Sequence, residues 1–297
     1  MSKNPNLGIW LMIGAVAAFA AQDGFSRYLA GEYNTLMVVM VRYWVFAGFV
    51  TLLALRRPEG IVASIRTRRP VAHFARAVLL VAEICIIVWG YTLIGLIESH
   101  AVFAICPLLV AGLSGLFLGE KISWHRWAAL GAGLVGVIVI LRPGMGVFTP
   151  AALLPLAAAF MFAVYSVLTR LTTREEATFP AFFWPGIIGA VLMTVIGLPN
   201  WQPIAAADWP LLILYAGISV FSHWLLLKCY EATEAARVQP YAYLQIVFVT
   251  MIGLTIYGET LAPLVAIGAA IVIAAGLYAL SLERKAPDAA VAKVSVT

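Results

Sequence analysis

Long apolar runs follow one another along this sequence, separated by charged, proline or glycine residues. A helix needs about 20 apolar residues to cross the hydrocarbon core of a bilayer, and ten runs are close to that length. Because a bilayer has no water to pair with backbone groups, spanning segments are helices or closed barrels, and runs without alternation favour helices. The sequence therefore predicts an all-α integral membrane protein with ten transmembrane helices.

The composition supports spans along the whole chain rather than one or two anchors. Of the 297 residues, 63% are apolar and only 11% are charged, which excludes an ordinary soluble domain and a disordered chain. One alternative for the first run is a cleavable signal peptide, because Lys3 precedes an apolar stretch that ends in small residues. The predicted spans are residues 7–30, 35–55, 70–93, 99–118, 124–141, 149–171, 181–198, 209–230, 236–257 and 261–282.

The distribution of basic residues predicts the orientation. With the N-terminus in the cytoplasm, the inner loops and tails collect most of the 19 lysines and arginines, whereas the outer loops hold only Arg142. This asymmetry is the positive-inside pattern, and it explains the net charge of +5 without a nucleic-acid partner. We therefore expect a multi-pass protein of the cell inner membrane, embedded in the lipid bilayer, with both termini in the cytoplasm.

The sequence also repeats itself weakly at about half its length. Shifts of 139 and 143 residues superpose three sets of positions, namely Tyr91 on Tyr230, Gly119-Glu120 on Gly258-Glu259, and Arg27 on Arg170. These matches agree on a boundary after the fifth span, which predicts repeats over residues 1–145 and 146–297. Since five spans is an odd number, the two halves cross the membrane in opposite senses. Such inverted repeats are typical of transporters that open a midplane site to either side in turn.

These features resemble one known family. Ten spans in two halves, an arginine within Val-Arg-Tyr-Trp of the second span, and a Gly-Glu pair between the last two spans of each half are similar to the drug/metabolite transporter superfamily, specifically its EamA-type members. Within that family the chain is most similar to exporters of amino acids, including the aromatic amino acid exporters of the YddG type. The resemblance implies alternating access and a pairing of the fifth span with the tenth. We interpret Glu120 and Glu259 as caps of the helix that follows each of them.

Four ionisable residues stand out inside the predicted spans, where a charge is costly and a function is the default interpretation. Asp23 and Arg42 lie ~10 Å below the outer surface on neighbouring spans, so we expect a salt bridge between them that either pins the two helices or acts as a gate. Arg76 lies near the cytoplasmic start of its span and is expected to snorkel. Glu83 lies near the bilayer centre with no basic neighbour within one turn. It is a candidate for proton or substrate binding, with a structural carboxyl as the alternative.

Polar stripes at helical spacing predict which spans face a cavity. The first, third, sixth and eighth spans carry them, and family resemblance adds the fourth, with His100 and Phe103, and the ninth. Aromatic side chains among them suit an aromatic or amphipathic ligand, although helix packing alone is the alternative for any one stripe. The predicted substrate-binding residues are Gln22, Asp23, Glu83, Trp89, Tyr165, Ser166, Ser222, His223, Tyr243 and Gln245.

The sequence thus predicts a secondary transporter that exports small metabolites, first of all amino acids with aromatic or apolar side chains. Export or exchange of another metabolite or drug, such as S-adenosylmethionine or a cationic drug, is the alternative. A membrane enzyme is a remoter one, because the histidines are scattered and no nucleotide-binding loop occurs. The three cysteines are widely spaced and predict neither a disulfide nor a metal site. We expect a monomer without metal or cofactor, with protons as the candidate coupling ion.

Overall fold

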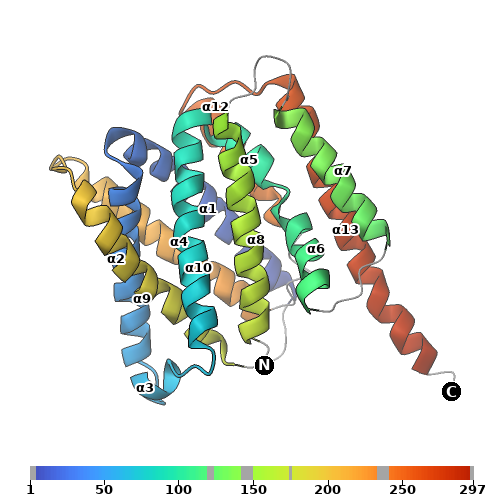
Figure 1. Cartoon of the computed structure of the whole chain (residues 1–297), viewed down its shortest axis with the longest axis horizontal. Coiled ribbons are helices and arrows are strands. Elements are labelled where there is room, and N and C mark those ends of the chain that lie inside the picture. The colour runs from blue at the N-terminus through green and yellow to red at the C-terminus, as the bar shows by residue number, and fades with distance from the viewer. Residues whose placement is uncertain (1–4, 119–123, 142–149, 174–175, 233–240, 295–297) are drawn as a thin grey trace.

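The computed structural model describes residues 5–118, 124–141, 150–173, 176–232 and 241–294, and Figure 1 shows this part of the chain as an array of helices. Seven of them are long and apolar enough to cross a membrane. Three shorter apolar helices cover Trp127–Leu141, Leu244–Thr255 and Pro263–Ala279. These segments coincide with the ten spans expected from the sequence, and the chain is an all-α membrane protein.

The helices of the first half are α1 (Pro5–Glu32), α2 (Thr35–Leu55), α3 (Ile61–Ser64), α4 (Pro70–Ile94), α5 (Leu96–Phe103), α6 (Cys106–Leu118) and α7 (Trp124–Leu141). Those of the second half are α8 (Leu153–Thr173), α9 (Thr178–Gly197), α10 (Trp209–Ala232), α12 (Leu244–Thr255) and α13 (Pro263–Val294), with 3-10 turns at η1 (Pro150–Ala152) and η2 (Leu198–Asn200). The last helix runs well past residue 282, so most of the expected C-terminal tail is helical.

Local sequence signals set several helix ends. The side chain of Asn34 accepts a hydrogen bond of 2.9 Å from the backbone N–H of Met37 and so caps α2. Pro70 occupies the first turn of α4, where its missing N–H leaves no helical bond unmade. Gly95 separates α4 from α5 with a φ of +88°, a conformation that other residues rarely adopt.

The fourth predicted span is not one helix, which corrects the sequence interpretation. It is divided into α5 and α6 by a turn at Ala104 and Ile105. Pro107 explains the break, since it has no N–H to donate to the carbonyl of Phe103 one turn earlier. In the ninth span a turn at Tyr243 precedes α12, and the 139-residue shift of the repeat lays Ala104 on Tyr243. The two halves are therefore interrupted at corresponding positions.

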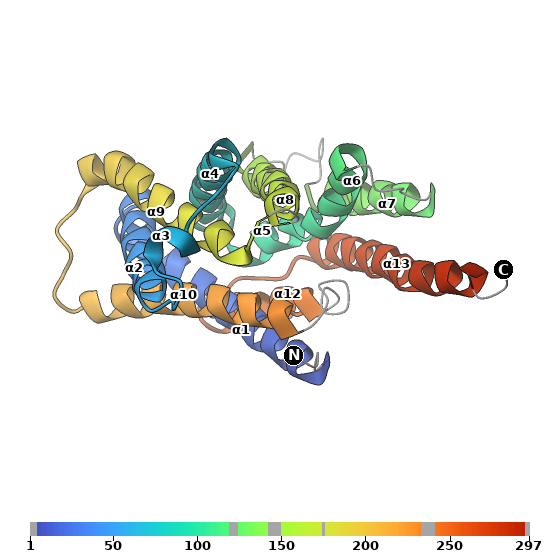
Figure 2. The same cartoon turned by 90° about the horizontal axis from the view of Figure 1, so that it is seen from below.

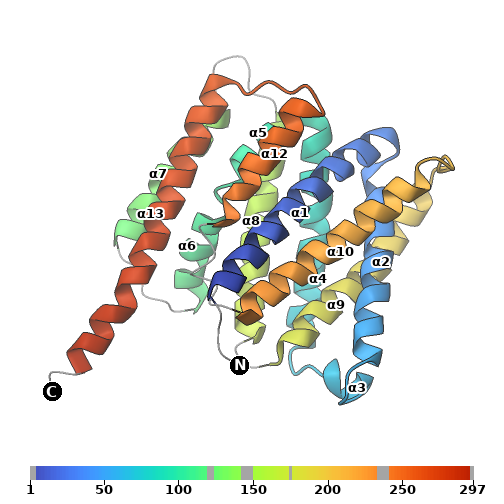
Figure 3. The ribbon, with the colours of Figure 1, turned by 180° about the vertical axis from the view of Figure 1, so that it is seen from behind.

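The helices lie in two layers that draw on both halves of the chain. Figure 2 shows α9, α4, α8 and α7 along one side and α10, α1, α12 and α13 along the other. The main contacts are α1 with α10, α4 with α8, and α2 with α9. Under the repeat the pair α1 and α10 corresponds to the pair α8 and α4, so the packing follows the internal symmetry. The start of α1 and the end of α13 lie at the same end of the bundle (Figure 3).

Helices α7 and α13 pack against each other at one edge of the array, as the family resemblance implied (Figure 1). Two glycines allow this close approach. A Cβ added to Gly136 would lie 2.8 Å from the carbonyl oxygen of Gly268, and one added to Gly268 would lie 2.6 Å from that of Gly136. Small residues at such crossings let helix backbones touch in a membrane.

Some expectations fall on residues that the structure does not describe. Gly119, Glu120 and Arg142 lie outside the described residues, as do the side chains of Arg170 and Tyr230. Glu259 lies within the described residues, and it caps a different helix from the one expected. Its carboxylate accepts hydrogen bonds from the N–H groups of Leu96 and Ile97, so it caps α5 rather than the following helix α13.

Candidate substrate-binding cavity

A cavity of about 310 Å³ lies between the two layers, bounded by α1, α2, α4, α5, α6, α8, α10 and the start of α12. Its wall is largely apolar, with aromatic side chains such as Phe19, Phe103 and Phe162. Both interrupted spans reach it, because Ala104 and Tyr243 are part of the wall. Its polar and ionisable lining residues include Gln22, Asp23, Arg42, Glu83, Tyr91, His100, Tyr165, His223, Tyr243 and Gln245.

Most of the predicted substrate-binding residues meet in this cavity. The structure brings together residues from α1, α4, α8, α10 and the ninth span that are far apart in the sequence. This matches the spans that the polar stripes had indicated. The predicted residues found in the wall are Gln22, Asp23, Glu83, Tyr165, His223, Tyr243 and Gln245, and the predicted gating residue Arg42 joins them.

Three predicted residues lie elsewhere. The hydroxyl of Ser166 donates to the carbonyl of Phe162, and that of Ser222 donates to the carbonyl of Ser219. Both serines thus bond to their own helix rather than line the cavity, a bond that lipid-buried serines commonly make. Trp89 is 41% exposed and faces away from the cavity.

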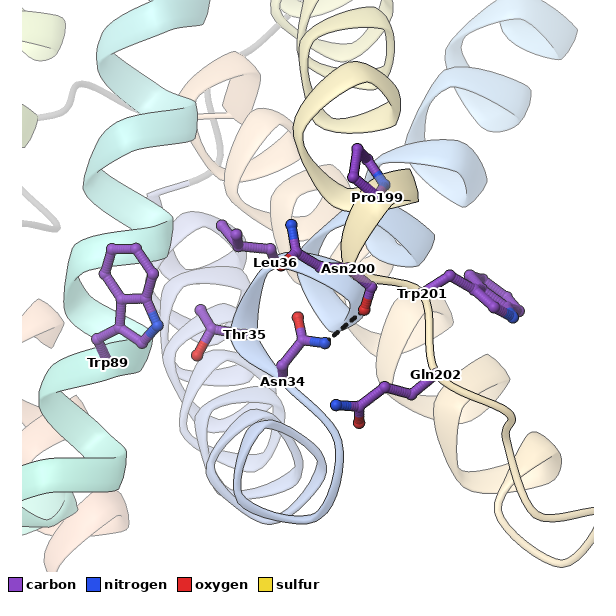
Figure 4. A pocket seen from close by; sticks show the side chains of 8 residues that line it. All are labelled: Asn34, Thr35, Leu36, Trp89, Pro199, Asn200, Trp201 and Gln202. Carbon is purple, nitrogen blue, oxygen red and sulfur yellow. Dashed lines mark hydrogen bonds between the residues drawn. The ribbon is translucent and has the colours of Figure 1, made fainter.

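Trp89 lines a different, shallow pocket near the end of α4 (Figure 4). The opposite wall comes from the start of α2 and from the segment after η2, where the side chain of Asn34 donates a hydrogen bond of 2.6 Å to the carbonyl of Asn200. Hydropathy does not distinguish the two faces of an apolar helix, so the sequence could not place Trp89. A tryptophan near the end of a spanning helix fits the interfacial belt of membrane proteins.

The expected salt bridge between Asp23 and Arg42 is replaced by other contacts of Asp23. One carboxylate oxygen, Oδ2, lies 3.1 Å from His100 Nε2 and accepts a hydrogen bond of 3.1 Å from Gln245 Nε2. The other, Oδ1, accepts one of 3.3 Å from Gln22 Nε2. The expected partner was wrong because α5 and α12 both pack against α1 on the side that carries Asp23.

Arg42 and Glu83 both line the cavity, and neither forms an ion pair within the described part of the chain. The close contacts between acidic and basic side chains in this region join Asp23 to His100 and Arg27 to Glu259. Arg42 is 7% exposed and Glu83 is 6% exposed. The hydroxyl of Tyr215 faces Arg42, and the charges that reach Glu83 are those of Arg42 and Asp23.

His100 and Tyr91 also line the cavity, and the sequence interpretation selected neither of them for its list of site residues. Their rings stack with centroids 5.3 Å apart and an interplanar angle of 11°. His100 stood in a helical stripe with Phe103, and Tyr91 stood at a repeated position. Both signals were present, but each is weak in a sequence rich in apolar residues.

A family comparison decides what kind of protein carries this cavity. The EamA-like transporter family matches residues 6–142 and again residues 149–281, which is nearly the whole chain. The chain belongs to the EamA-like transporter family. It is therefore a transporter of small molecules rather than a member of an enzyme family. The resemblance to EamA-type transporters found in the sequence is confirmed.

Characterised relatives of this EamA-like transporter cover almost its full length. It is 27% identical over 289 residues to a riboflavin transporter of Vibrio cholerae, covering 96% of each chain. It is 26% identical to an S-adenosylmethionine uptake transporter of Rickettsia felis, covering 93% of each. It is 22% identical to the pseudopaline exporter CntI of Pseudomonas aeruginosa, covering 94% of this chain and 97% of the other. These names include uptake and export of several metabolites.

A solved structure supports the fold of the EamA-like chain. That structure superposes with a TM-score of 0.63 at 18% sequence identity, and the match covers 95% of this chain and all of the other. At this identity the likeness concerns the fold alone.

A polar network surrounds Arg76 in the first half of α4 of the EamA-like transporter. Arg76 is 1% exposed, so it does not snorkel as expected. Its Nε donates to the hydroxyl of Thr169 at 2.9 Å, and one terminal nitrogen donates to the carbonyl of Ala181 at 3.0 Å. The other lies 3.0 Å from Nδ1 of His73. Arg76 thus ties α4 to α8 and α9.

The network continues to Glu176, in the connection between α8 and α9. Its carboxylate accepts hydrogen bonds from the hydroxyl of Thr67 and from the N–H of Arg68, and it lies 3.1 Å from Nε2 of His73. Burial raises the pKa of Glu176, but these hydrogen bonds outweigh it and hold the pKa below its ordinary value. The cluster links the loop before α4 to the second half of the chain.

The described residues offer no cluster of three or more His, Cys, Asp or Glu that could hold a metal ion. The polar groups of the cavity are instead arranged as separate carboxylates, one guanidinium and two imidazoles. Such a set can bind and orient a charged organic molecule by ion pairs and hydrogen bonds.

Proposed function

We propose that this EamA-like transporter moves amino acids with aromatic or other apolar side chains out of the cytoplasm. The observation that carries the proposal is the pair Arg42 and Glu83. One is basic and the other acidic, both line one cavity, and neither forms an ion pair within the described part of the chain. A buried charge without a partner is destabilising by several kcal/mol. A zwitterionic head group would satisfy both at once.

In this proposal the substrate carboxylate binds the guanidinium of Arg42, whose fork of donors suits a carboxylate. The substrate ammonium binds Glu83. The side chain then packs against a wall built from Phe103, Phe162 and Tyr165, whose rings follow one another at centroid distances of 6.0 and 5.7 Å. Edge-on and tilted aromatic rings at this spacing are favourable partners for a further ring.

Alternating access is supported by the interruptions at Ala104 and Tyr243. Transporters built from inverted repeats commonly place their binding site where helices of the two halves are broken at corresponding positions. The proposal includes a boundary between residues 145 and 146, a functional monomer in the inner membrane with both termini cytoplasmic, and protons as the coupling ion.

S-adenosylmethionine is a second candidate, and a specific feature favours it. It has the same amino-acid head group and one further positive charge, and the cavity holds two carboxylates, Asp23 and Glu83, against one guanidinium. Relatives named S-adenosylmethionine uptake transporters support the same choice. Riboflavin is neutral, so it could form hydrogen bonds with Arg42 and Glu83 but could not form an ion pair with either.

The test is counterflow of labelled compounds into sealed vesicles that contain the purified protein. The panel contains phenylalanine, tryptophan, leucine, S-adenosylmethionine and riboflavin. Phenylalaninamide, which lacks the carboxylate, and 3-phenylpropionate, which lacks the ammonium group, serve as competitors. We expect both to compete much more weakly than phenylalanine.

Arg42→Gln should abolish the preference for phenylalanine over phenylalaninamide, because the group that reads the carboxylate is then missing. Movement of S-adenosylmethionine but of no proteinogenic amino acid would favour the second candidate. Movement of riboflavin alone would contradict both, while leaving the family assignment intact.

A further inference from the structure

One buried ionisable pair of the cavity takes no part in the proposed contacts with the substrate head group. His100 Nε2 lies 3.1 Å from Asp23 Oδ2, and the two residues are 4% and 7% exposed. Gln245 donates to the same oxygen of Asp23, and Gln22 donates to the other. Each carboxylate oxygen of Asp23 thus has a protein partner, and the proposed amino-acid head group binds elsewhere, at Arg42 and Glu83.

The pair lies where the two halves of the transporter meet. Asp23 is on α1 and His100 on α5, which both belong to the first half, whereas Gln245 is on α12 of the second half. Each of these three helices contacts the other two. A movement of one half against the other must therefore alter the surroundings of Asp23 and His100.

The chemistry of the pair suits a proton. Histidine is the side chain whose charge ordinarily changes near physiological pH. When His100 is protonated the pair is neutral, and when it is not the pair carries one negative charge. His100 Nε2 makes no aligned hydrogen bond despite its short distance to Asp23. A small rotation of either helix can therefore make or break the proton-sharing contact.

The other charged or titratable groups that line the cavity around the pair come from several helices. Arg42 supplies the positive charge and Glu83 a second carboxylate, while the remaining groups are neutral in their ordinary forms. They are Arg42 from α2, Glu83 and Tyr91 from α4, Cys106 from α6, Tyr165 from α8, His223 from α10 and Tyr243 at the start of α12. With Arg42 and Glu83 ionised, uptake of one proton by the pair brings the net charge of these four side chains to zero. A buried site disfavours net charge, so it favours this uptake.

We infer that Asp23 and His100 form a proton-binding site that couples transport to a pH gradient and is separate from the substrate contacts at Arg42 and Glu83. The inference rests on the proposed transport function. By this inference His100 Nε2 carries the proton when it lies beside Asp23, as it does in the structure. When α12 moves relative to α1 and α5, water reaches the pair and accepts the proton as hydronium, which leaves a neutral imidazole. No other bond forms or breaks.

The test compares two readouts in vesicles that contain the full-length protein, with labelled phenylalanine as the probe. One is exchange at equal pH on both sides, which needs substrate binding but no net proton movement. The other is net movement driven by a pH gradient alone. His100→Gln can still bond to Asp23 but has no basic nitrogen that can take up a proton. We expect gradient-driven movement to fall about tenfold or more in this variant, while exchange stays within about twofold of wild type.

His125→Gln is the matched control, because His125 is on α7 and does not line the cavity. It should retain both activities. Asp23→Asn is a second variant of the pair and should also lose gradient-driven movement, with thermal unfolding in detergent used to show that each variant is folded.

Gradient-driven movement that survives in folded His100→Gln would overturn the inference. So would loss of exchange together with gradient-driven movement in that folded variant, since His100 would then be a substrate contact. If the wild-type protein exchanges phenylalanine but does not respond to a pH gradient, the inference is overturned and the proposed function is not. Absence of exchange in wild type would instead contradict the proposed function.

Discussion

Arg27 on α1 forms an ion pair with Glu259, and the same carboxylate accepts hydrogen bonds of 2.8 and 2.9 Å from the N–H groups of Leu96 and Ile97. One side chain from the connection between α12 and α13 thus neutralises a cation of α1 and caps α5. Gly95 makes room for it, since a Cβ there would lie 2.8 Å from an oxygen of Glu259. Three segments from both halves depend on this carboxylate.

We therefore predict that Glu259→Gln destabilises the folded protein by about 2 kcal/mol, the usual contribution of hydrogen bonds to a charged group. The substitution keeps the shape of the side chain but removes its charge from the ion pair and from the cap. Thermal unfolding in detergent measures the effect. Glu59→Gln is the control, because Glu59 pairs with Arg57 where both side chains are 40% or more exposed, and such surface pairs contribute little. Equal unfolding temperatures for Glu259→Gln and Glu59→Gln would contradict the prediction.

Glu83→Gln should weaken transport of phenylalanine while leaving the protein at least as stable as wild type. The described part of the chain gives Glu83 no ion-pair partner, so removing its charge deletes a desolvated group rather than a stabilising contact. We expect a higher KM for phenylalanine and little change for 3-phenylpropionate, which has no ammonium group. Initial rates in vesicles and unfolding temperatures provide the two measurements. If Glu83→Gln transports phenylalanine at the wild-type rate over roughly pH 6 to 8, the role of Glu83 is structural and the prediction is wrong.

Trp89→Ala should leave substrate exchange unchanged, since the indole faces a shallow pocket outside the cavity (Figure 4). Phe162→Ala is the informative comparison, because Phe162 belongs to the aromatic wall of the cavity. We expect that variant to weaken binding of phenylalanine more than that of leucine. Competition assays in vesicles test both variants. If Trp89→Ala weakens phenylalanine binding more than Phe162→Ala does, Trp89 is a binding residue after all and the prediction is wrong.

The spans and most helices that line the cavity could be predicted from the sequence, because apolar runs and polar stripes report burial in lipid and within the bundle. The second span was not expected there, although α2 contributes Arg42 to the wall. Side-chain contacts between helices could not be predicted. Asp23 and Arg42 were paired on equal depth, yet depth does not report rotation, and the side of α1 that carries Asp23 faces His100 and Gln245. The break at Ala104 was missed for a related reason. Pro107 lies in an unbroken apolar run, and hydropathy does not register the missing backbone donor.

A last prediction concerns the dependence of stability on pH through Glu176. Hydrogen bonds from Thr67, His73 and the N–H of Arg68 hold its pKa below its ordinary value, despite burial. A carboxyl with a lower pKa in the folded state binds a proton more weakly there than in the unfolded state. The network therefore stabilises the folded protein above the unfolded pKa of about 4.3, and this contribution is lost as the pH falls through the lower folded value.

Glu176→Gln should accordingly lower the unfolding temperature at pH 7, and its difference from wild type should shrink as the pH falls below about 4. Thr67→Val tests the cause. It removes the hydroxyl that donates to Glu176 at 2.8 Å but keeps the carboxylate, so part of the same pH-dependent stability should disappear. Thermal unfolding in detergent from neutral to acidic pH gives the comparison. A difference between wild type and Glu176→Gln that is constant with pH would mean that packing, rather than the charge of Glu176, holds the loop before α4 against the second half.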